Sequence, residues 1–451
     1  MNSKGEFSGF LLGGVNSGSG KTTLALALMR AFARRGLAVA PFKCGPDYID
    51  PSFHRQAAGR PSANLDTFFL DDRQLEELFR RRATDCDMAI VEGVMGLFDG
   101  TGSDFRQGSS AEIALKLELP VILVVNARGL SGSIAPLVKG FADWNPQLRI
   151  AGVIADFTGS AAHAEILART LETAQLPPLL GYLQRNDCWR LPERHLGLST
   201  GPLDSGWLDA LAEEAERTID LDQLLALTRR PQPEPPPVES LPPVQTRLGV
   251  ARDAAFQFHY EENFELLRKF GVATVDFSPL ADSELPPELD GLWFGGGYPE
   301  LYAEQLASNT SLLEAIRDFA GRNRPIYGEC GGYLYLAETL TDLEGRSHRM
   351  TALLPGHATM NRRLAALGYR ELVTTVPGIF GPPGTPLRGH EFHYSTMELP
   401  AGGTALFDAT DPRGRGFRAG TVSGRVSGSY IHLALASNPT AARHFAGELA
   451  K

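Results

Sequence analysis

The sequence predicts two α/β domains, and the first is built on a parallel β-sheet with a phosphate-binding loop. Short apolar runs alternate with segments of helical periodicity, a pattern typical of a parallel sheet that helices cover on both faces. A proline-rich stretch, 231–245, interrupts this alternation, and proline at such density cannot continue a helix or a central strand. The alternation restarts after it. We therefore expect domains at 1–230 and 246–451, joined by that linker.

Each expected element follows from its composition and period. Before the linker, apolar runs predict buried strands at Phe10–Leu12, Ala38–Phe42, Met88–Val91, Val121–Val125 and Ile150–Ile154. Helical periodicity predicts helices between them at Lys21–Arg35, Arg73–Arg82, Ala111–Leu117 and Ala161–Thr173. After the linker, strands are expected at Leu248–Ala251, Ala273–Phe277, Gly291–Phe294 and Pro325–Tyr327. Two helices are expected there, around Glu261–Phe270 and Leu312–Gly321.

Composition excludes several classes of protein. The net charge of −10 argues against a nucleic-acid-binding protein, whose surface would be basic. No apolar run approaches the roughly 18 residues needed to span a bilayer, and the N-terminus lacks the features of a signal peptide. The 4 cysteines contain no CxxC pair, which argues against a zinc site or a disulfide framework and favours a reducing cytoplasm.

A phosphate-binding loop is expected at Gly13-Gly-Val-Asn-Ser-Gly-Ser-Gly-Lys21-Thr-Thr23, between the first strand and the first helix. Its glycines let the backbone wrap a phosphate, and the helix N-terminus stabilises the negative charge. We expect Lys21 to reach the β- and γ-phosphates and the Thr22 hydroxyl to bind Mg²⁺. The usual first glycine is replaced by Val15, so the loop counted from Gly14 is one residue longer. The expected nucleotide contacts are Gly14, Ser17, Gly18, Gly20, Lys21, Thr22 and Thr23.

Four acidic residues are expected at the carboxyl ends of the next two strands, where open α/β sheets bind ligands. Asp47 and Asp50 follow the second strand, and Glu92 and Asp99 follow the third. Carboxylate oxygens suit Mg²⁺, and Glu92 ends its strand where the acid of a Walker-B motif is expected. The alternative for each acid is a solvated loop position or a helix cap. Cys44, in the same region, is interpreted as a packing residue and not as a nucleophile.

A second reactive group is expected in Gly328-Glu-Cys330-Gly-Gly332, between a strand and a helix. Small flanking residues permit the strained turn that exposes a nucleophile, and the helix dipole there favours a thiolate. The base is expected to be His432, with His390 and His393 as rivals. The glycines at 295–297 can offer backbone amides to an oxyanion. The alternatives are a buried core thiol and a core histidine that only packs.

A chain with both features can activate a carboxylate with ATP and supply ammonia cut from glutamine, so an amide-forming ligase is the favoured function. The chain resembles the cobyrinic acid a,c-diamide synthase family, glutamine-dependent corrinoid amidases that are also called hydrogenobyrinic acid a,c-diamide synthases. The N-terminal half also resembles dethiobiotin synthetase, which has the same longer phosphate loop. The motifs that carry the first resemblance are Phe42–Pro51, Gly59–Ser62, Asn64–Asp66, Glu92–Gly100, Leu191–Gly197, Gly295–Glu300, Gly328–Gly332 and Glu391–Ser395.

The resemblance implies an ATP-binding amidoligase domain followed by a class I glutamine amidotransferase domain. ATP would phosphorylate the c and a acetate carboxylates of cobyrinic or hydrogenobyrinic acid in turn, and ammonia from L-glutamine would attack each acyl phosphate. Carried over by motif, Cys330 is the thioester-forming nucleophile and His432 is its base. The implied Mg²⁺ ligands are Thr22, Asp47 and Glu92, with Asp50 and Asp99 near the transferring phosphate or the substrate. We expect a cytoplasmic enzyme without nucleic-acid or membrane partners that can form a homodimer.

Three positions depart from the expected pattern. Ala434 stands two residues after His432, where many class I amidotransferases have Glu. Asn126 stands where Asp is expected, and 155–159 replaces an Asn-Arg or Asn-Lys pair that could lie near the base of the nucleotide. Two alternative functions stay open: the same amidation on another tetrapyrrole, such as nickel-sirohydrochlorin or sirohaem, and a non-catalytic scaffold ATPase. The second leaves the C-terminal half unexplained.

Overall fold

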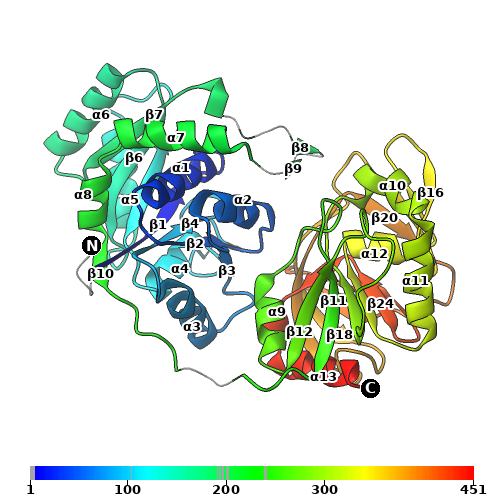
Figure 1. Cartoon of the computed structure of the whole chain (residues 1–451). Helices are drawn as coiled ribbons and strands as arrows, with labels where there is room; N and C mark the ends of the chain where they lie inside the picture. The colour runs from blue at the N-terminus through cyan, green and yellow to red at the C-terminus, as the bar shows by residue number, and fades with distance from the viewer. Residues whose placement is uncertain are drawn as a thin grey trace. The chain divides into compact units, whose positions relative to one another are not determined.

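A computed structural model describes residues 6–102, 104–189, 191, 194–195, 198–199, 203–237 and 241–451. The chain divides into two compact units, Met1–Val238 and Glu239–Lys451, which Figure 1 colours from blue to green and from green to red. This division falls within the proline-rich stretch 231–245. Both units are α/β folds, as the sequence predicts. Among the described residues, no helix combines the length and apolar character needed to cross a bilayer.

The N-terminal unit is built on one sheet with the strand order β3-β2-β4-β1-β5-β6-β7, in which all neighbours are parallel. Strand β10 adds antiparallel to the start of β1, where Glu6 pairs with Pro231. Pro231, assigned to the linker from sequence, therefore belongs to a short edge strand, a position that tolerates proline. The strands are β1 (Glu6–Gly14), β2 (Val39–Cys44), β3 (Ala63–Leu65), β4 (Met88–Glu92), β5 (Val121–Asn126), β6 (Ile150–Thr158), β7 (Leu179–Gln184) and β10 (Arg229–Pro231).

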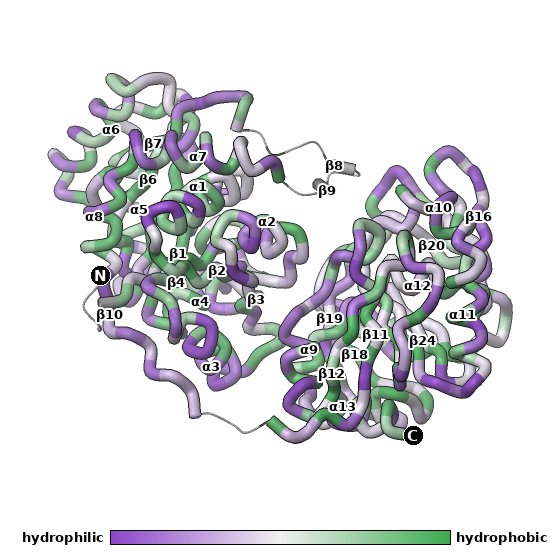
Figure 2. Tube along the Cα trace, in the orientation of Figure 1, coloured by the Kyte–Doolittle hydropathy of each residue, from purple (hydrophilic) through white to green (hydrophobic). Residues whose placement is uncertain are grey.

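Helices cover both faces of this sheet because its strands are apolar on both sides. Phe7 and Leu11 of β1 contribute to one core and Phe10 and Leu12 to the other, as the alternation of a strand requires. Figure 2 shows the strands in green between helices with purple outer turns. The first core packs against α3 (Asp72–Ala83), α4 (Ser110–Lys116), α5 (Ile134–Trp144) and α6 (Ala161–Thr173). The second packs against α1 (Lys21–Arg34), α2 (Ile49–Ala58), α7 (Ser205–Thr218) and α8 (Leu221–Leu227).

The C-terminal unit has a central sheet with the strand order β12-β11-β13-β14-β24-β23, parallel except for β23. Its strands are β11 (Thr246–Ala251), β12 (Val272–Phe277), β13 (Gly291–Phe294), β14 (Ile326–Glu329), β23 (Thr421–Ser423) and β24 (Val426–Ser429). Its helices are α9 (Glu261–Arg268), α10 (Ala303–Ser308), α11 (Thr310–Gly321), α12 (Gly331–Leu336) and α13 (Pro439–Leu449).

Two further sheets in this unit were not predicted. An antiparallel sheet orders its strands β22-β21-β18-β19-β25, and a four-stranded sheet orders them β16-β15-β17-β20. The first consists of β18 (Ala366–Thr374), β19 (Pro386–His393), β21 (Phe407–Thr410), β22 (Gly416–Ala419) and β25 (Ile431–Leu433). The second consists of β15 (Thr339–Thr341), β16 (Ser347–Arg349), β17 (His357–Met360) and β20 (Ser395–Glu398).

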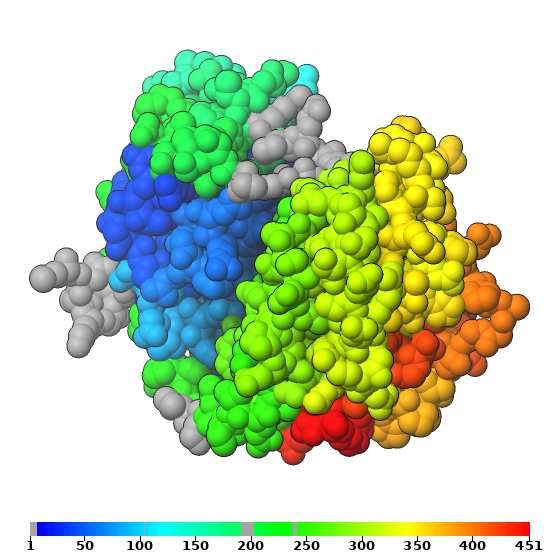
Figure 3. Space-filling model, turned by 45° about the vertical axis from the view of Figure 1, so that its right-hand side comes forward, coloured from blue at the N-terminus to red at the C-terminus, as the bar shows by residue number. Residues whose placement is uncertain are grey.

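An aromatic core joins the antiparallel sheet to the central sheet of this unit. Trp293 and Tyr327 of the central sheet contact each other edge to face, and Phe380 and Phe445 pack against them. Phe445 lies on the inner side of α13, whose outer side forms the red surface patch in Figure 3. This packing fixes β25 beside β19 and β14, and the candidate base and nucleophile lie on β25 and at the end of β14.

Candidate active sites

The predicted phosphate-binding loop connects β1 to α1 at the carboxyl end of a central strand. Gly18 and Gly20 have left-handed backbone, with φ of 75° and 91°. A Cβ on Gly20 would lie 1.7 Å from a carboxylate oxygen of Asp156, and one on Gly14 would lie 2.2 Å from Ser19 Oγ. No larger residue fits at these two positions, so both must be glycine. Glycine lets the backbone turn tightly enough to wrap a phosphate.

The Lys21 ammonium is held by carbonyl oxygens inside this loop. Its Nζ donates to the backbone oxygens of Asn16 at 3.2 Å and Met95 at 2.5 Å. Burial, followed by the charge of Lys43, lowers the pKa of Lys21. A phosphate oxygen is a better partner than a carbonyl for an ammonium group, so a nucleotide can draw Lys21 out of these contacts. Ser17 is exposed at the loop tip, and Thr23 is partly exposed in the first turn of α1.

A buried network of charged residues lies beside the loop, where β2 and β4 end. Glu92 is the last residue of β4, and its Oε1 accepts from Thr22 Oγ1 at 2.6 Å and from Lys43 Nζ at 2.8 Å. Lys43 Nζ also contacts Asp50 Oδ2 at 2.6 Å. His54 Nε2 lies 2.6 Å from Glu92 Oε2. The sequence assigned roles to Thr22, Asp50 and Glu92, but it missed Lys43 and His54.

Pairing offsets the cost of burial for the charged forms of Lys43 and Glu92 but not for that of Asp50. Burial lowers the pKa of Lys43, but the Asp50 and Glu92 carboxylates more than offset this and raise it above its ordinary value. Burial alone would raise the pKa of Glu92, yet Lys43 and His54 hold it below its usual range. Burial, then the charge of Asp47, raises the pKa of Asp50. A lysine within a buried strand is almost always paired with an acidic side chain. The position of Lys43 in an apolar strand could therefore have identified it as part of this network.

The other predicted residues of this unit differ in their surroundings. The Asp47 Oδ1 accepts from the backbone N–H groups of Ile49 at 2.8 Å and Asp50 at 3.3 Å, so it caps the start of α2. Asp99 is exposed and accepts from Gly96 N at 2.8 Å. Asn126 accepts from the backbone N–H of Arg128. Cys44 is buried in the core of the unit, as expected of a packing residue. In the Leu191–Gly197 motif, residues 192–193 and 196–197 lie outside the described parts of the chain.

The donor set suits Mg²⁺ only together with a nucleotide. No group of three or more His, Cys, Asp or Glu side chains in the described parts of the chain could hold a metal ion alone. Mg²⁺ keeps several waters and is usually bound by one or two protein oxygens plus substrate phosphates. Thr22 Oγ1 and Glu92 supply two such oxygens 2.6 Å apart. The residues present therefore fit a magnesium–nucleotide complex.

In the C-terminal unit, Cys330 lies at a strained turn between β14 and α12. Its φ is 47°, an uncommon value for a residue with a side chain. Its backbone N–H donates to the Ser429 carbonyl at 2.8 Å, and its Sγ lies 3.7 Å from the carbonyl oxygen of Phe392. A Cβ on Gly332 would lie 2.2 Å from the Phe294 carbonyl oxygen. The turn therefore requires small neighbours, as the sequence predicts for a nucleophile elbow.

The expected resting thiolate is not supported by the structure. Burial, followed by the charge of Glu300, raises the pKa of the Cys330 thiol to about 12, and the N–H of Gly331 opposes this shift. Helix α12 is 6 residues long, so the dipole invoked from sequence is weak compared with the loss of solvation. Cys330 therefore rests as a thiol and needs a base.

His432 lies beside this turn, on β25. It is buried, and a Cβ on Gly296 would lie 2.3 Å from its Cε1 atom, so the glycine cluster 295–297 packs against the imidazole. Its Nδ1 is 3.7 Å from Oε2 of Glu329, the residue before the nucleophile. Burial, followed by His390, His259 and His393, lowers the pKa of His432. An imidazole that is neutral at rest is what a general base requires.

The two rival histidines differ in what they already bind. His393 directs Nδ1 to the Ser395 carbonyl at 2.8 Å and Nε2 to Glu391 at 3.0 Å, and its ring stacks on Tyr430. Both of its nitrogens thus face oxygen acceptors, which leaves neither in position to take a proton. His390 pairs with His432 across β19 and β25. These contacts favour His432 over His393 as the base.

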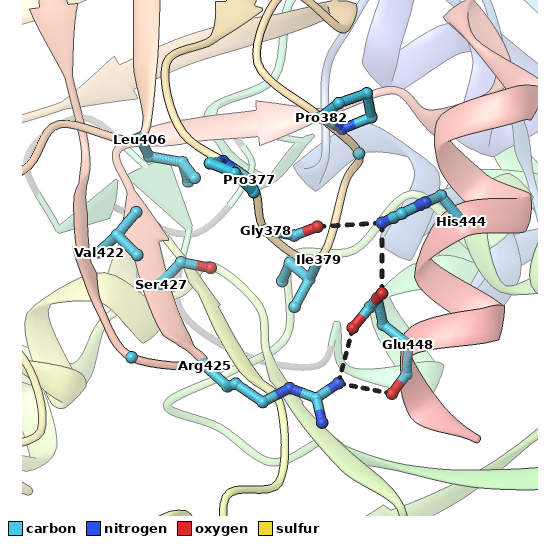
Figure 4. Close-up of a pocket in the computed structure, with 12 residues that line it drawn as sticks. Pro377, Gly378, Ile379, Pro382, Leu406, Val422, Arg425, Ser427, His444 and Glu448 are labelled. Atoms are coloured by element: carbon cyan, nitrogen blue, oxygen red, sulfur yellow. Dashed lines mark hydrogen bonds and ion pairs between the residues drawn. The ribbon is translucent and has the colours of Figure 1, made fainter. Parts of the chain in front are cut away.

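A cavity of about 400 Å³ lies elsewhere on this unit, beside α13. Figure 4 shows Arg425, His444 and Glu448 at its edge, where His444 Nε2 is 3.4 Å from Glu448 and 3.2 Å from the Gly378 carbonyl. None of the predicted site residues lines it.

The folds and the two sites define an α/β protein that joins a nucleotide-binding domain to a glutamine amidotransferase domain. Residues 11–198 match the family described as the CobQ/CobB/MinD/ParA nucleotide binding domain. Residues 247–440 match the CobB/CobQ-like glutamine amidotransferase domain. The predicted fold class is thereby confirmed in both halves.

Curated relatives named cobyrinate a,c-diamide synthase match almost the whole chain. The one from Syntrophotalea carbinolica is 43% identical over 96% of this chain and 97% of its own length. The one from Dehalococcoides mccartyi strain CBDB1 is 40% identical over 98% of both chains, and that from Salmonella typhimurium is 41% identical over 97% of both. The chain belongs to the cobyrinate a,c-diamide synthase family, as its motifs predict.

The geometry of the Cys330 turn predicts that Gly332→Ala destabilises the C-terminal unit. The added Cβ would meet the Phe294 carbonyl, a backbone atom that no rotamer change can move. We expect a loss of about 1–3 kcal/mol in the free energy of unfolding, measured by chemical denaturation. Gly321→Ala is the matched control, because a Cβ there meets no atom within 4 Å. Equal stability of the two variants would contradict this description of the turn.

A second prediction concerns Asp156, which packs against Gly20 in the phosphate loop. Burial raises its pKa from 3.8 to about 6. Between those pH values the folded protein holds a proton that the unfolded chain has released, so stability falls as the pH rises through this window. Asp156→Asn should therefore stabilise the N-terminal unit by about 1–3 kcal/mol at pH 7.5 and have little effect at pH 4.

The control for this measurement is Asp85→Asn, since Asp85 is exposed in the same unit. Thermal unfolding of both variants at the two pH values gives the comparison. A pH-independent effect of Asp156→Asn would show that its carboxyl is not shifted by burial.

Proposed function

We propose that this chain converts the a and c acetate carboxylates of cobyrinic or hydrogenobyrinic acid to amides, with ATP and glutamine as co-substrates. The observation that carries the proposal is the presence of two complementary sites in one chain: a phosphate loop beside buried acids, and a cysteine at a strained turn beside a neutral histidine. Membership of the cobyrinate a,c-diamide synthase family supports the choice of substrate. The 4 cysteines are free, which fits the reducing cytoplasm that we propose as its location.

In the N-terminal unit, the loop amides and Lys21 would bind the phosphates of ATP. Thr22 and Glu92, with Asp47 as the third proposed ligand, would hold Mg²⁺, which when bound stabilises charge on the phosphates. Lys43 lies between Glu92 and Asp50, so it limits the repulsion between these acids and an incoming substrate carboxylate. That carboxylate attacks the γ-phosphorus, ADP leaves, and an acyl phosphate forms.

In the C-terminal unit, Cys330 would release ammonia from glutamine. As Sγ attacks the amide carbon, His432 takes the thiol proton and passes it to the departing nitrogen, which leaves as ammonia. Water then hydrolyses the thioester to glutamate. We propose that the oxyanion is stabilised by backbone N–H groups of the 295–297 cluster, which packs beside His432, other than that of Gly296, which already donates to the Phe258 carbonyl at 3.1 Å. Ammonia displaces phosphate from the acyl phosphate, and the product is the amide.

The division of labour between the units gives the sharpest test of this function. Cys330→Ala should lose all glutamine-dependent synthesis, because no other thiol lies at the turn, yet it should make the diamide when ammonium salt is supplied at elevated pH. Product formation is measured by mass spectrometry with ATP, Mg²⁺ and candidate tetrapyrroles. Turnover of nickel-sirohydrochlorin or sirohaem in place of the corrinoids would show that the substrate is another tetrapyrrole. Glutamine-dependent synthesis by Cys330→Ala would show that Cys330 is not the nucleophile.

The next prediction concerns the phosphoryl-transfer site, whose variants ammonium salt should not rescue. Lys21→Ala should abolish synthesis with either nitrogen donor, since transition-state stabilisation by such a cation is commonly worth several kcal/mol. Glu92→Gln and Asp47→Asn should impair ATP-dependent activation, while glutamine still forms a thioester on Cys330. A chelator should stop synthesis in the wild-type protein, and added Mg²⁺ should restore it. Near-normal synthesis by Lys21→Ala would remove the phosphate loop from the mechanism, and unchanged ATP-dependent synthesis by the two acid variants would show that Mg²⁺ is bound elsewhere.

A further inference from the structure

A buried carboxylate in the C-terminal unit has no role in the chemistry above. Glu329 is the last residue of β14, directly before Cys330, and only 2% of its surface is exposed. Its Oε1 accepts a hydrogen bond from the backbone N–H of Leu433 at 2.9 Å. Its Oε2 lies 3.7 Å from Nδ1 of His432. The carboxyl group thus reaches both the proposed base and the residue that follows it.

A histidine base needs an acceptor at one nitrogen so that the other is the unprotonated one. The position two residues after His432 cannot supply it, because Ala434 has no polar side-chain atom. The acceptor must therefore come from another part of the fold. At Nδ1 of His432, the structure places a carboxylate from the strand that carries the nucleophile.

Strand topology explains how Glu329 reaches this position. Strands β14 and β24 are parallel, and Glu329 pairs with Ser429 in their register. The chain then turns through Tyr430 into β25, and the Ser429 hydroxyl fixes this turn by accepting from the backbone N–H of Ile431 at 3.2 Å. The turn carries His432 over the end of β14. Glu329 is thus held by the same backbone that fixes Cys330 and His432.

We propose that Glu329 is the positioning carboxylate of His432 in the glutamine reaction, an inference that rests on the proposed function. It holds the imidazole with Nδ1–H toward Oε2, which leaves Nε2 unprotonated. Nε2 takes the Cys330 proton as the C–S bond forms and delivers it to the nitrogen as the C–N bond breaks. Between these steps the imidazolium is stabilised by Glu329. The 3.7 Å separation is longer than a hydrogen bond, and we expect it to shorten during the reaction, as catalytic contacts commonly do.

The charges around the pair agree with this role. Burial raises the pKa of Glu329 to about 8, opposed by the N–H of Leu433. Burial also lowers the pKa of His432, and His390, His259 and His393 lower it further. Each group is therefore costly to charge alone in this environment. An ion pair of the two is stabilised by their mutual attraction, so ionised Glu329 would stabilise the imidazolium that forms when His432 takes the proton of Cys330.

A second carboxylate–histidine pair, Glu391 with His393, lies nearby. It is the closer pair at 3.0 Å, but Arg370 also contacts Glu391 at 2.7 Å. As shown above, both nitrogens of His393 are already directed to oxygen acceptors. This pair is therefore a structural contact in our proposal, and it provides the comparison that the experiment needs.

The test is Glu329→Gln in the full-length chain, because Gln keeps the shape and can still accept from Leu433. We expect kcat for glutamine hydrolysis to fall by at least about tenfold, since general acid–base steps contribute factors of that size or more, with KM little changed. With the γ-(4-nitrophenyl) ester of glutamate the loss should be several-fold smaller, because nitrophenolate leaves without a proton. Glu329→Asp, which keeps the carboxylate, should retain more activity than Glu329→Gln.

Two matched variants make the outcomes decisive. Glu448→Gln alters an unrelated carboxylate–histidine pair (Figure 4) and should leave kcat unchanged. Three outcomes would overturn the proposal. Glu329→Gln could lose the same factor in kcat with glutamine and with the ester, it could keep the wild-type kcat with both, or Glu329→Asp could be no more active than Glu329→Gln. If Glu391→Gln instead lost more kcat with glutamine than with the ester, His393 would be the base. Failure of the proposed function is distinguishable, since glutamine-dependent synthesis would then be missing from the wild-type chain itself.

Discussion

A charged side chain buried at the end of a strand must find its counter-charge inside the protein, because an unpaired ion loses its hydration without compensation. Glu92 meets this constraint through Lys43, which stands opposite it in the parallel register of β2 and β4. A one-residue slip of β2 would turn Lys43 to the other face of the sheet. The pair therefore helps to fix the register of two strands, and it draws α2 into place through Asp50 and His54.

The same constraint orders the C-terminal unit around an acid and a histidine. Glu329 is buried, and it accepts from the backbone N–H of Leu433 and approaches Nδ1 of His432. These contacts hold the end of β14 against β25, although the two strands belong to different sheets. The strained backbone at Cys330 is sustained by this junction, with Ser429 on one side and the tightly packed glycines on the other.

Much of the fold could be predicted from sequence because parallel strands with both faces buried appear as continuous apolar runs. Strands such as β18 were missed, since they alternate buried and exposed residues and no run of that kind marks them. The phosphate loop and the cysteine turn were visible as local glycine patterns. Lys43, His54 and Glu329 were not assigned roles, because their importance lies in partners that only strand register and turns bring close. The thiolate expected for Cys330 is not supported, because the loss of solvation on burial raises its pKa more than the dipole of a 6-residue helix can lower it.

The two sites share a further property: each keeps its reactive groups neutralised until substrate arrives. Lys43 balances Glu92, and Lys21 is held by carbonyl oxygens, so both of these cations already have partners inside the N-terminal site. In the C-terminal site, burial favours an uncharged Cys330 and an uncharged His432. A thiol is a poor nucleophile, which limits its reaction with other electrophiles. On this view, bound glutamine places its amide oxygen against the backbone N–H groups that stabilise the oxyanion, and it changes the solvation of Cys330. Both effects make proton transfer to His432 favourable, so that ammonia is released only when an amide occupies the turn.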